Sequence, residues 1–342
     1  MKLKHLEHVE DLVLLDDNGL DICKKYLTSA LNTLYGIKSC DIQGKIDGSP
    51  SFVYGKHPTE NKKIISTKSF FNKTPKYYSS ISEIQECQHE DLRNKLEITY
   101  KSLHDIDNIF QGDILFTKDS LYVRTIDGIE HIIFTPNTIT YAIESESEIG
   151  QKILDSVIGI AWHTSYSGDT VENLSANFTK FDIEDICNVF QFNTTLDITK
   201  CISHEEYEMM MNEIESIRFS GYDDSLKYMK QYINYTIKNA KNMTYDDYCE
   251  FFYTKDCSTD CVENREKIEE FFEFYYKVIS VKQYIILQLE RFSKFKTYIN
   301  VCNELIKTKQ EGYVVIIDGI PVKFVDRYDF SKVNFLMSKN RK

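Results

Sequence analysis

The sequence of 342 residues has only 5 prolines, 13 glycines and one tryptophan. Because glycine and proline are so few, long disordered linkers are not expected. The sequence also lacks any run of about 18 consecutive apolar residues, so no segment is expected to cross a membrane as a helix. The N-terminal residues contain no apolar segment of the kind found in signal peptides. We therefore expect a protein of the cytoplasm.

The nine cysteines are odd in number and show no regular spacing. This pattern is typical of reduced thiols in a cytosolic protein rather than of a disulfide framework. Cys257 and Cys261 form a CxxxC pair with Cys249 upstream, but no second pair at zinc-finger spacing follows. Because a structural zinc ion needs four ligands, we predict free cysteines and no zinc site.

Basic residues are in the minority, and the net charge is -12. Proteins that bind nucleic acid usually carry a basic surface, so this balance counts against such a partner. The charge is unevenly spread, however. Residues 203–275 include 17 acidic and 8 basic residues, whereas residues 56–76 contain six lysines and a single glutamate. We interpret the lysine-rich segment either as part of a basic face or as a solvated loop.

The apolar pattern predicts an α+β fold. In residues 5–36, apolar residues recur at helical spacing and predict a helix. Gly36 is a typical residue at which a helix stops. Short connections at residues 117–119 and at Asp127-Gly128 predict two hairpins between strands. The strands of this antiparallel sheet are predicted at 51–55, 63–67, 112–117, 120–125, 130–135 and 138–143.

Residues from about 180 to 308 return to a helical pattern, which is clearest in residues 262–308. The C-terminal part then predicts a hairpin, with Asp318-Gly319 as a type I′ turn between strands 312–317 and 320–325. We therefore expect a helical lobe inserted into a strand-rich domain. The predicted parts are an N-terminal helical segment (1–36), a strand-rich domain (37–175), a helical insertion (176–308) and closing strands (309–342).

The segment Lys45-Ile46-Asp47-Gly48-Ser49-Pro50 places a lysine just before a glycine-containing turn. Such an amine can attack the α-phosphate of a nucleotide and form a phosphoramidate. The amine must be neutral to attack, so we expect burial or neighbouring cations to lower its pKa. Taken alone, the segment is also compatible with a hairpin turn that carries an exposed lysine.

Three further segments carry groups suited to nucleotide chemistry. Glu311 precedes a predicted strand and could hold Mg²⁺, and Lys323 on the next strand could neutralise charge on the α-phosphate. Asp113 follows Gln111-Gly112 and could accept hydrogen bonds from ribose hydroxyls. Trp162 could stack on a purine, although a lone tryptophan is more often a core residue.

The order of these motifs resembles that of the covalent nucleotidyltransferase superfamily, which contains ATP-dependent RNA and DNA ligases and mRNA capping enzymes. Within it, the chain is most similar to RNA-ligase-like proteins of large tailed phages. The resemblance covers residues 40–170 and 305–330. Further segments that carry it are His8-Val9-Glu10-Asp11, Thr67-Lys68-Ser69, Pro136-Asn137-Thr138 and His163-Thr164-Ser165-Tyr166.

The resemblance implies a ligase-type nucleotidyltransferase domain and an ATP-dependent polynucleotide ligase, with RNA favoured over DNA. It implies that Lys45 carries AMP, that Lys323 contacts the α-phosphate and that Glu311 binds Mg²⁺. The implied partners are nucleic acid ends with a 5′-phosphate and a 3′-hydroxyl, in the host cytoplasm if the protein is phage-encoded. The implied ATP-binding residues are Asp47, Gly48, Lys68, Asp113 and Trp162.

The sequence departs from the superfamily pattern in three places. The last motif normally has two lysines separated by one residue, but Val325 takes the second place here, and Arg327 or Lys332 are candidate substitutes. Asp113 is shorter than the usual glutamate, and the interval between Trp162 and Glu311 is unusually long. Two other hypotheses therefore stay open. The chain could transfer AMP to a protein or small molecule, or it could be a degenerate ligase fold that serves as a binding module.

Overall fold

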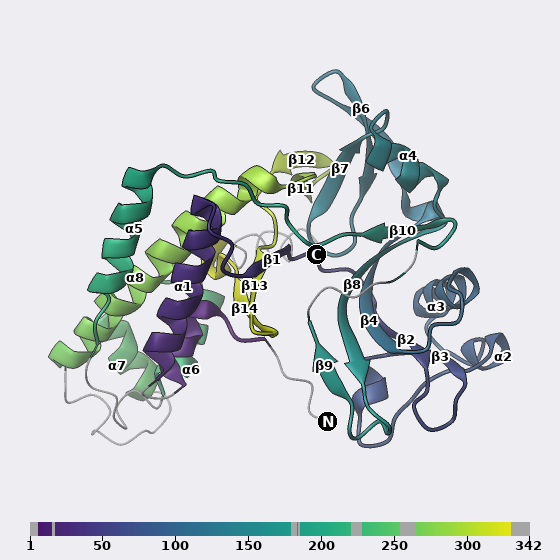
Figure 1. The fold of residues 1–342 in the computed structure, drawn as a ribbon, viewed down its shortest axis with the longest axis horizontal. Coiled ribbons are helices and arrows are strands. Elements are labelled where there is room, and N and C mark those ends of the chain that lie inside the picture. The colour runs from purple at the N-terminus through teal and green to yellow at the C-terminus, as the bar shows by residue number, and fades with distance from the viewer. Residues whose placement is uncertain are drawn as a thin grey trace.

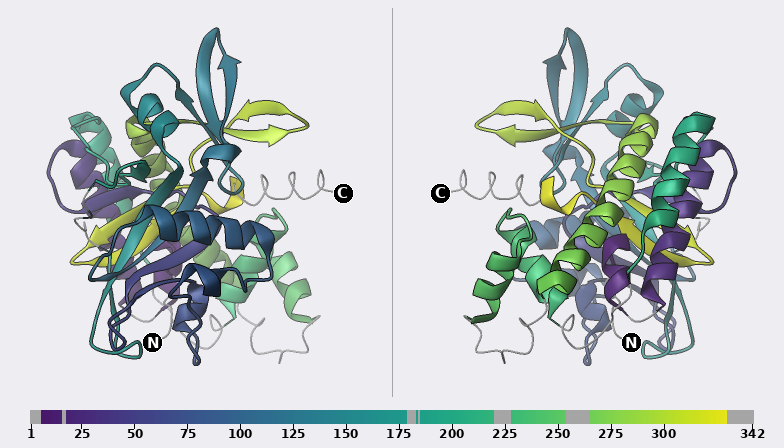
Figure 2. Two further views of the ribbon diagram at one scale, coloured as in Figure 1. Left: turned by 90° about the vertical axis from the view of Figure 1, so that its right-hand side faces the viewer. Right: turned by 90° about the vertical axis from the view of Figure 1, so that its left-hand side faces the viewer.

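The computed structural model describes residues 6–15, 18–178, 183, 185–219, 228–253 and 265–329. Within these ranges the protein has an α+β fold with three β-sheets. In Figure 1 the long helices lie on the left and the two larger sheets on the right, with a three-stranded sheet between them. Figure 2 shows two hairpins, β5–β6 and β11–β12, that project from the same end of the molecule.

The six-stranded sheet has the order β10-β8-β4-β2-β3, with β9 attached to β8. All its neighbouring strands are antiparallel except β10, which runs parallel to β8. The strands are β2 (Ser51–Lys56), β3 (Lys63–Thr67), β4 (Ile109–Thr117), β8 (Ile158–Ser167), β9 (Ser175–Asn177) and β10 (Val189–Phe192).

The five-stranded sheet is antiparallel throughout and has the order β12-β11-β7-β6-β5. Apolar side chains of this sheet and of the six-stranded sheet share one core, in which Phe116 lies 5.1 Å from Phe134 between ring centroids. The strands are β5 (Tyr122–Ile126), β6 (Ile129–Phe134), β7 (Thr140–Glu144), β11 (Lys296–Val301) and β12 (Glu304–Lys307).

The three-stranded sheet joins the two ends of the described chain. It consists of β1 (Asp41–Gly44), β13 (Tyr313–Ile317) and β14 (Ile320–Phe324), paired antiparallel in the order β1-β13-β14. The side chains of one of its faces belong to the same core as the long helices. These side chains include Ile42, Tyr313, Val315, Val322 and Phe324.

The helical lobe is held together by the apolar faces of its helices, because these bury many aromatic and aliphatic side chains in one core. No helix among the described residues is long and apolar enough to cross a membrane. The helices of the lobe are α1 (Gly19–Tyr35), α5 (His204–Ser216), α6 (Met229–Lys238), α7 (Tyr245–Tyr253) and α8 (Arg265–Leu289). The other helical segments are η1 (Val9–Leu14), η2 (Lys68–Phe71), α2 (Ile81–Ile84), α3 (Glu90–Ser102), η3 (Lys118–Ser120), α4 (Glu148–Asp155) and η6 (Glu290–Phe292).

Several predicted boundaries are confirmed, and for the expected local reasons. Gly36 ends α1 with φ of 99°, a left-handed conformation in which its amide caps two carbonyls of the last turn. Asp318 and Gly319 have φ of 52° and 76°, as a type I′ turn between β13 and β14 requires. Asp127 and Gly128 join β5 and β6 in the same way, with φ of 52° and 80°.

The hairpin predicted at residues 117–119 is wrong. The chain leaves β4 through η3 and enters β5 in the other sheet, so β4 pairs with β2 and β8 instead. The Thr117 hydroxyl and the Ser120 hydroxyl cap this 3₁₀ turn, which redirects the chain.

The prediction of one helical segment from 176 to 308 also needs correction. The long helices of this range end at Leu289, β10, β11 and β12 lie within it, and β9 overlaps its start. Phe295 continues the spacing of the apolar stripe of α8, but it packs between the two larger sheets, beside Tyr141 and Phe192. Short strands with few alternating positions give too weak a pattern to outweigh the neighbouring helix.

The cysteines agree with the prediction where the structure describes them. Cys23, Cys40 and Cys87 are buried free thiols, and the other described cysteines are also free. Cys257 and Cys261 lie outside the described residues.

A buried network of charges connects the N-terminal segment to α8 and to the chain after β14. The Lys282 ammonium group lies 2.7 Å from a Glu10 carboxylate oxygen and also donates to the carbonyl of Val325 at 2.8 Å. Arg327 donates to Asp11 at 2.8 Å, and the Tyr275 hydroxyl donates to the same carboxylate. Lys282 and Glu10 are each only 2% exposed, so each charge depends on the other for its solvation.

Replacing Glu10 with Gln should therefore destabilise the fold strongly, because it leaves the Lys282 charge buried without its closest partner. We expect the free energy of unfolding in urea to fall by about 3–5 kcal/mol. The control is Glu148→Gln, which breaks the exposed pair with Lys152 and should leave the urea midpoint unchanged. Equal midpoints for wild type and Glu10→Gln would contradict this account of the network.

Candidate functional site

The loop that begins at Lys45 spans from the three-stranded sheet to the six-stranded sheet. Its first end continues the pairing of β1 with β13, since the Lys45 amide donates to the Gly312 carbonyl at 2.8 Å. Its other end is fixed to β4, where the Ser49 amide donates to the Ile114 carbonyl at 3.0 Å. The loop is therefore held by backbone hydrogen bonds to two different sheets.

Two residues of the loop explain its close fit. Ile46 is buried in the core shared by the two larger sheets, and so anchors the loop between Lys45 and Asp47. Gly48 lies flat against β4, because a Cβ atom there would come within 2.3 Å of the Ile114 carbonyl oxygen. Any larger residue would push the loop away from the sheet.

Glu311 is the central carboxylate of the site. It is 2% exposed, and its Oε2 atom accepts hydrogen bonds from the Asp47 amide at 2.7 Å and from Lys45 Nζ at 3.4 Å. The Lys45 ammonium group also forms an ion pair with the Asp47 carboxylate. The second oxygen of Glu311, Oε1, is buried and has no hydrogen-bond partner among the described residues. A buried carboxylate oxygen without a partner is costly, which is typical of a site that binds a ligand or ion.

Lys323 reaches the same region from β14. It pairs with Val314 on β13, which in turn pairs with Gln43 on β1, and cross-strand partners present their side chains on one face. Burial lowers the pKa of Lys323, and the positive charge of Lys45 lowers it further. Lys68, at the start of η2, is exposed, and its charge contributes to the same effect. The three lysines therefore form one positive region, in which the carboxylates of Asp47 and Glu7 oppose part of the charge.

His8 is an unexpected neighbour of this region. The N-terminal segment adds a parallel bridge to the outer edge of β14, with His8 opposite Lys323 and the Lys323 amide donating to the Glu7 carbonyl at 2.9 Å. Burial lowers the pKa of His8 to about 2, and the positive charges of nearby arginine and lysine side chains, Lys45 among them, reinforce the shift. The sequence pointed to His8 only through the resemblance and gave it no role.

Asp113 occupies the other side of the loop. Its Oδ2 atom accepts a hydrogen bond from the Gly48 amide at 3.2 Å, and its Oδ1 atom lies 3.6 Å from Nε2 of His163. Burial raises the pKa of Asp113, but interactions with His163, Ser51 and Gly48 outweigh it and lower the pKa overall. Asp113 is thus kept ionised as a hydrogen-bond acceptor beside the loop.

Trp162 does not belong to this cluster. It pairs with Gly112 on β4, whereas Asp113 pairs with Ala161, so the tryptophan lies on the opposite face of the sheet from Asp113. The ring is 5% exposed and packs in the core against Phe52 and against Phe110. Its indole nitrogen donates to the Gln191 side chain at 2.8 Å.

The expected lowering of the pKa of Lys45 is wrong for this arrangement. Burial does lower it, but the carboxylates of Asp47 and Glu311 outweigh burial and raise the pKa above its ordinary value. Burial and the nearby Asp47 charge also raise the pKa of Glu311, to about 7. The lysine is therefore protonated and ion-paired in this structure, not a free amine.

Two carboxylates, those of Asp47 and Glu311, lie beside Lys45 and could hold a magnesium ion. Mg²⁺ is usually bound by one or two carboxylates together with phosphate oxygens and water, and Asp47 and Glu311 provide such a pair. No cluster of three or more metal-binding side chains occurs in the part of the chain that the structure describes.

Of the two candidate substitutes for the missing second lysine, only Arg327 lies among the described residues, and it is bound elsewhere. The Arg327 guanidinium is bound to Asp11 and to Asn234, away from solvent. Lys332 lies outside the described residues.

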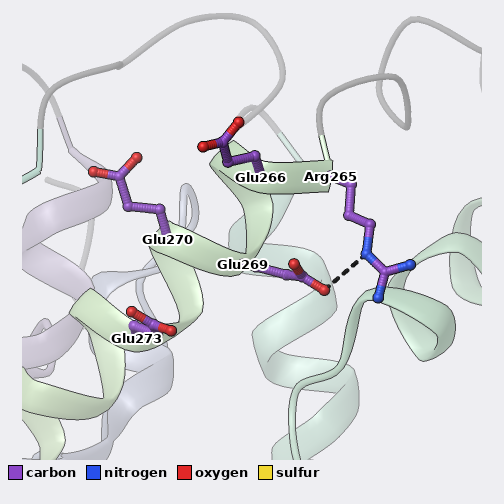
Figure 3. Close-up of a pocket in the computed structure, with 5 residues that line it drawn as sticks. All are labelled: Arg265, Glu266, Glu269, Glu270 and Glu273. Carbon is purple, nitrogen blue, oxygen red and sulfur yellow. Dashed lines mark hydrogen bonds and ion pairs between the residues drawn. The ribbon is translucent and has the colours of Figure 1, made fainter.

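A separate hollow of about 420 Å³ lies at the start of α8 and is strongly acidic. Figure 3 shows that its side chains come from one helix and that only Arg265 pairs with a carboxylate, that of Glu269. This hollow would repel phosphate groups, so we do not regard it as the nucleotide site. The carboxylates that line it are those of Glu266, Glu269, Glu270 and Glu273.

A protein-family model described as a family of unknown function, DUF6267, matches residues 3–339, and the chain therefore belongs to this family. No curated protein and no solved structure matches the chain.

The environment of His8 should make stability depend on pH. Its pKa is about 2 in the folded protein and about 6.5 in an unfolded chain, so below pH 6.5 only the unfolded state takes up the proton. This proton uptake should lower the free energy of unfolding by about 1.4 kcal/mol per pH unit as the pH falls from 6.5. Urea denaturation at pH 7 and pH 5 measures it, and His8→Asn should show a correspondingly smaller loss. Equal losses for both proteins would contradict the buried neutral imidazole.

Proposed function

We propose that this protein is an ATP-dependent polynucleotide ligase, with RNA favoured over DNA, and that Lys45 carries AMP as a covalent intermediate. The strand-rich part would then be a ligase-type nucleotidyltransferase domain. The main support is that Lys45 contacts Glu311, and that Lys323 lies on the same small sheet. This follows from the pairing of β1 with β13 and of β13 with β14. The order of the motifs in the sequence assigns to these residues the roles of nucleophile, metal ligand and phosphate contact.

In the first step, Lys45 Nζ attacks the α-phosphorus of ATP. A nitrogen–phosphorus bond forms, the bond from that phosphorus to the bridging oxygen breaks, pyrophosphate leaves, and the nitrogen releases one proton to solvent. Lys323 and Lys68 would neutralise the negative charge that develops on the phosphates, since both belong to the same positive region. Glu311 and Asp47 would hold Mg²⁺, which when bound supplies further charge neutralisation.

The ion pairs of Lys45 affect how this step begins. A protonated amine cannot attack, and the carboxylates of Asp47 and Glu311 keep the amine protonated in this structure. If these carboxylates turn to a metal ion, the lysine loses the interactions that raise its pKa. In this proposal, substrate binding and activation of the nucleophile are therefore coupled through Glu311.

In the later steps, an oxygen of the 5′-phosphate of RNA attacks the AMP phosphorus, and Lys45 is released with the return of a proton. The 3′-hydroxyl of a second strand end then attacks the 5′-phosphorus, and AMP leaves. A nucleic acid partner is supported by Lys68, Lys73 and Lys76, which are exposed and for which no ion pair is found among the described residues. Of these, Lys68 lies close enough to Lys323 for its charge to lower the pKa of Lys323.

A second candidate is a ligase fold that binds a nucleotide without reacting with it. The observation that favours it is the raised pKa of Lys45, together with Val325 in the place of a second lysine. The same measurement separates the two candidates.

We expect purified protein, incubated with α-labelled ATP and Mg²⁺, to retain label on a denaturing gel, and Lys45→Ala to retain none. Lys45→Arg should also fail, because a guanidinium group stays protonated. Lys101→Ala, which removes an exposed lysine of α3, is the matched control and should label like wild type. Absence of label on the wild-type protein, even with pyrophosphatase present to remove the pyrophosphate product, would favour the non-reacting nucleotide binder.

The acceptor can be tested with the isolated, labelled protein. A 5′-phosphorylated RNA should remove the label from Lys45 and yield RNA capped with AMP. The same RNA with a 5′-hydroxyl should not, since it lacks the phosphate whose oxygen attacks. A 5′-phosphorylated DNA of equal sequence measures the preference for RNA. If neither polymer discharges the adduct, the acceptor is not a nucleic acid end, and a protein or small molecule takes its place in the reaction.

A further inference from the structure

The residue next to Trp162 lies in a different environment. The pairing of β4 with β8 shifts between Gln111, which is opposite Thr164, and Gly112, which is opposite Trp162. His163 is the extra residue of this β-bulge. Bulges redirect a side chain and are frequent beside functional sites.

The bulge turns His163 toward the candidate site. Its Nε2 atom lies 3.6 Å from Oδ1 of Asp113, and the other oxygen of that carboxylate accepts from the Gly48 amide in the Lys45 loop. Its Nδ1 atom lies 2.8 Å from the Thr164 hydroxyl. Both ring nitrogens thus face protein groups, so a ligand would contact the face of the ring.

The exposure of the ring distinguishes it from Trp162. The His163 side chain is 36% exposed, whereas Trp162 is 5% exposed within the core and is held there by Gln191. Gly112 leaves room for the tryptophan, because a Cβ atom there would lie 2.9 Å from the indole ring. The indole is therefore fixed behind the sheet, and the imidazole is the aromatic plane beside Asp113.

We propose that His163, rather than Trp162, stacks against the base of the nucleotide, with Asp113 beside it at the ribose. This inference rests on the proposed function, because it assigns the base-binding residue of the same nucleotide site. The Thr164 hydroxyl, 2.8 Å from Nδ1, restrains the plane of the ring, so less conformational freedom is lost when a base stacks on it. The ligand class is a purine nucleotide.

Binding of AMP and of ribose 5-phosphate to the full chain tests the inference, since the two ligands differ only in the base. With wild type, isothermal titration calorimetry should show AMP binding more tightly, by about tenfold for one stacked base. His163→Ala should remove most of this difference, and His163→Phe should keep it, because an aromatic face is retained. Tyr122→Ala, an exposed aromatic residue on β5, is the control and should keep the full difference.

Two results would overturn the proposal. If His163→Ala weakens both ligands equally, the imidazole acts only by positioning Asp113. If His163→Ala binds both ligands as wild type does, the base is held elsewhere.

Failure of the proposed function is a separate result, because AMP binding needs no reaction at Lys45. A base-dependent affinity that requires His163, in a protein that never takes up label, would leave this site standing and remove the ligase assignment.

Discussion

The Glu311 carboxylate is the group on which the arrangement of the site depends. It precedes β13, yet it fixes the loop after β1 by accepting from the Asp47 amide at 2.7 Å and from the Lys45 ammonium group at 3.4 Å. Because it is almost fully buried, these interactions replace its lost hydration. Segments that are 264 residues apart in sequence are thereby held in one place. Without this carboxylate, the loop would keep its backbone bonds but lose the orientation of the lysine.

The buried charge network of Glu10, Asp11, Lys282 and Arg327 also supports this arrangement, by fixing the elements next to the site. Glu10 and Asp11 bind Lys282 of α8 and Arg327 after β14, so the N-terminal segment is fixed to both. The same segment carries His8, which lies opposite Lys323 at the edge of the sheet. Charges that are costly to bury on their own thus set the position of β14 relative to the helices. In this way the helical lobe contributes to the site, although its residues do not line the Lys45 loop.

The sequence predicts most where a reactive residue stands in a recognisable motif and a turn signal fixes which strand lies beside it. Lys45, Glu311 and Lys323 were identified from motif order, and the hairpin at Asp318-Gly319 required Lys323 to lie near the strand that follows Glu311. What it did not reveal depends on pairing between distant strands. The bulge that exposes His163 arises from the register of β4 with β8, and the passage of the chain between sheets at 117–119 depends on a short 3₁₀ turn. The burial of Trp162 agrees with the alternative of a core residue. The protonated state of Lys45 was missed for a similar reason, since it depends on how closely two carboxylates approach the amine.

Two carboxylate oxygens on opposite sides of the Lys45 loop are buried without a hydrogen-bond partner among the described residues, Oε1 of Glu311 and Oδ1 of Asp113. A fold that served only for stability would gain by pairing them or by replacing them with apolar groups. The amides of Asp47 and Gly48 bind the other oxygen of each carboxylate, so one short loop leaves both groups half satisfied. Such an arrangement loses stability in the free protein and recovers it when a ligand supplies a cation on one side and a hydrogen-bond donor on the other. A nucleoside triphosphate with Mg²⁺ carries both, through its metal ion and its ribose hydroxyls. The unpaired Glu311 oxygen, beside an ion-paired lysine, is thus a physical reason to regard the Lys45 loop as a binding site and not only as a turn between strands.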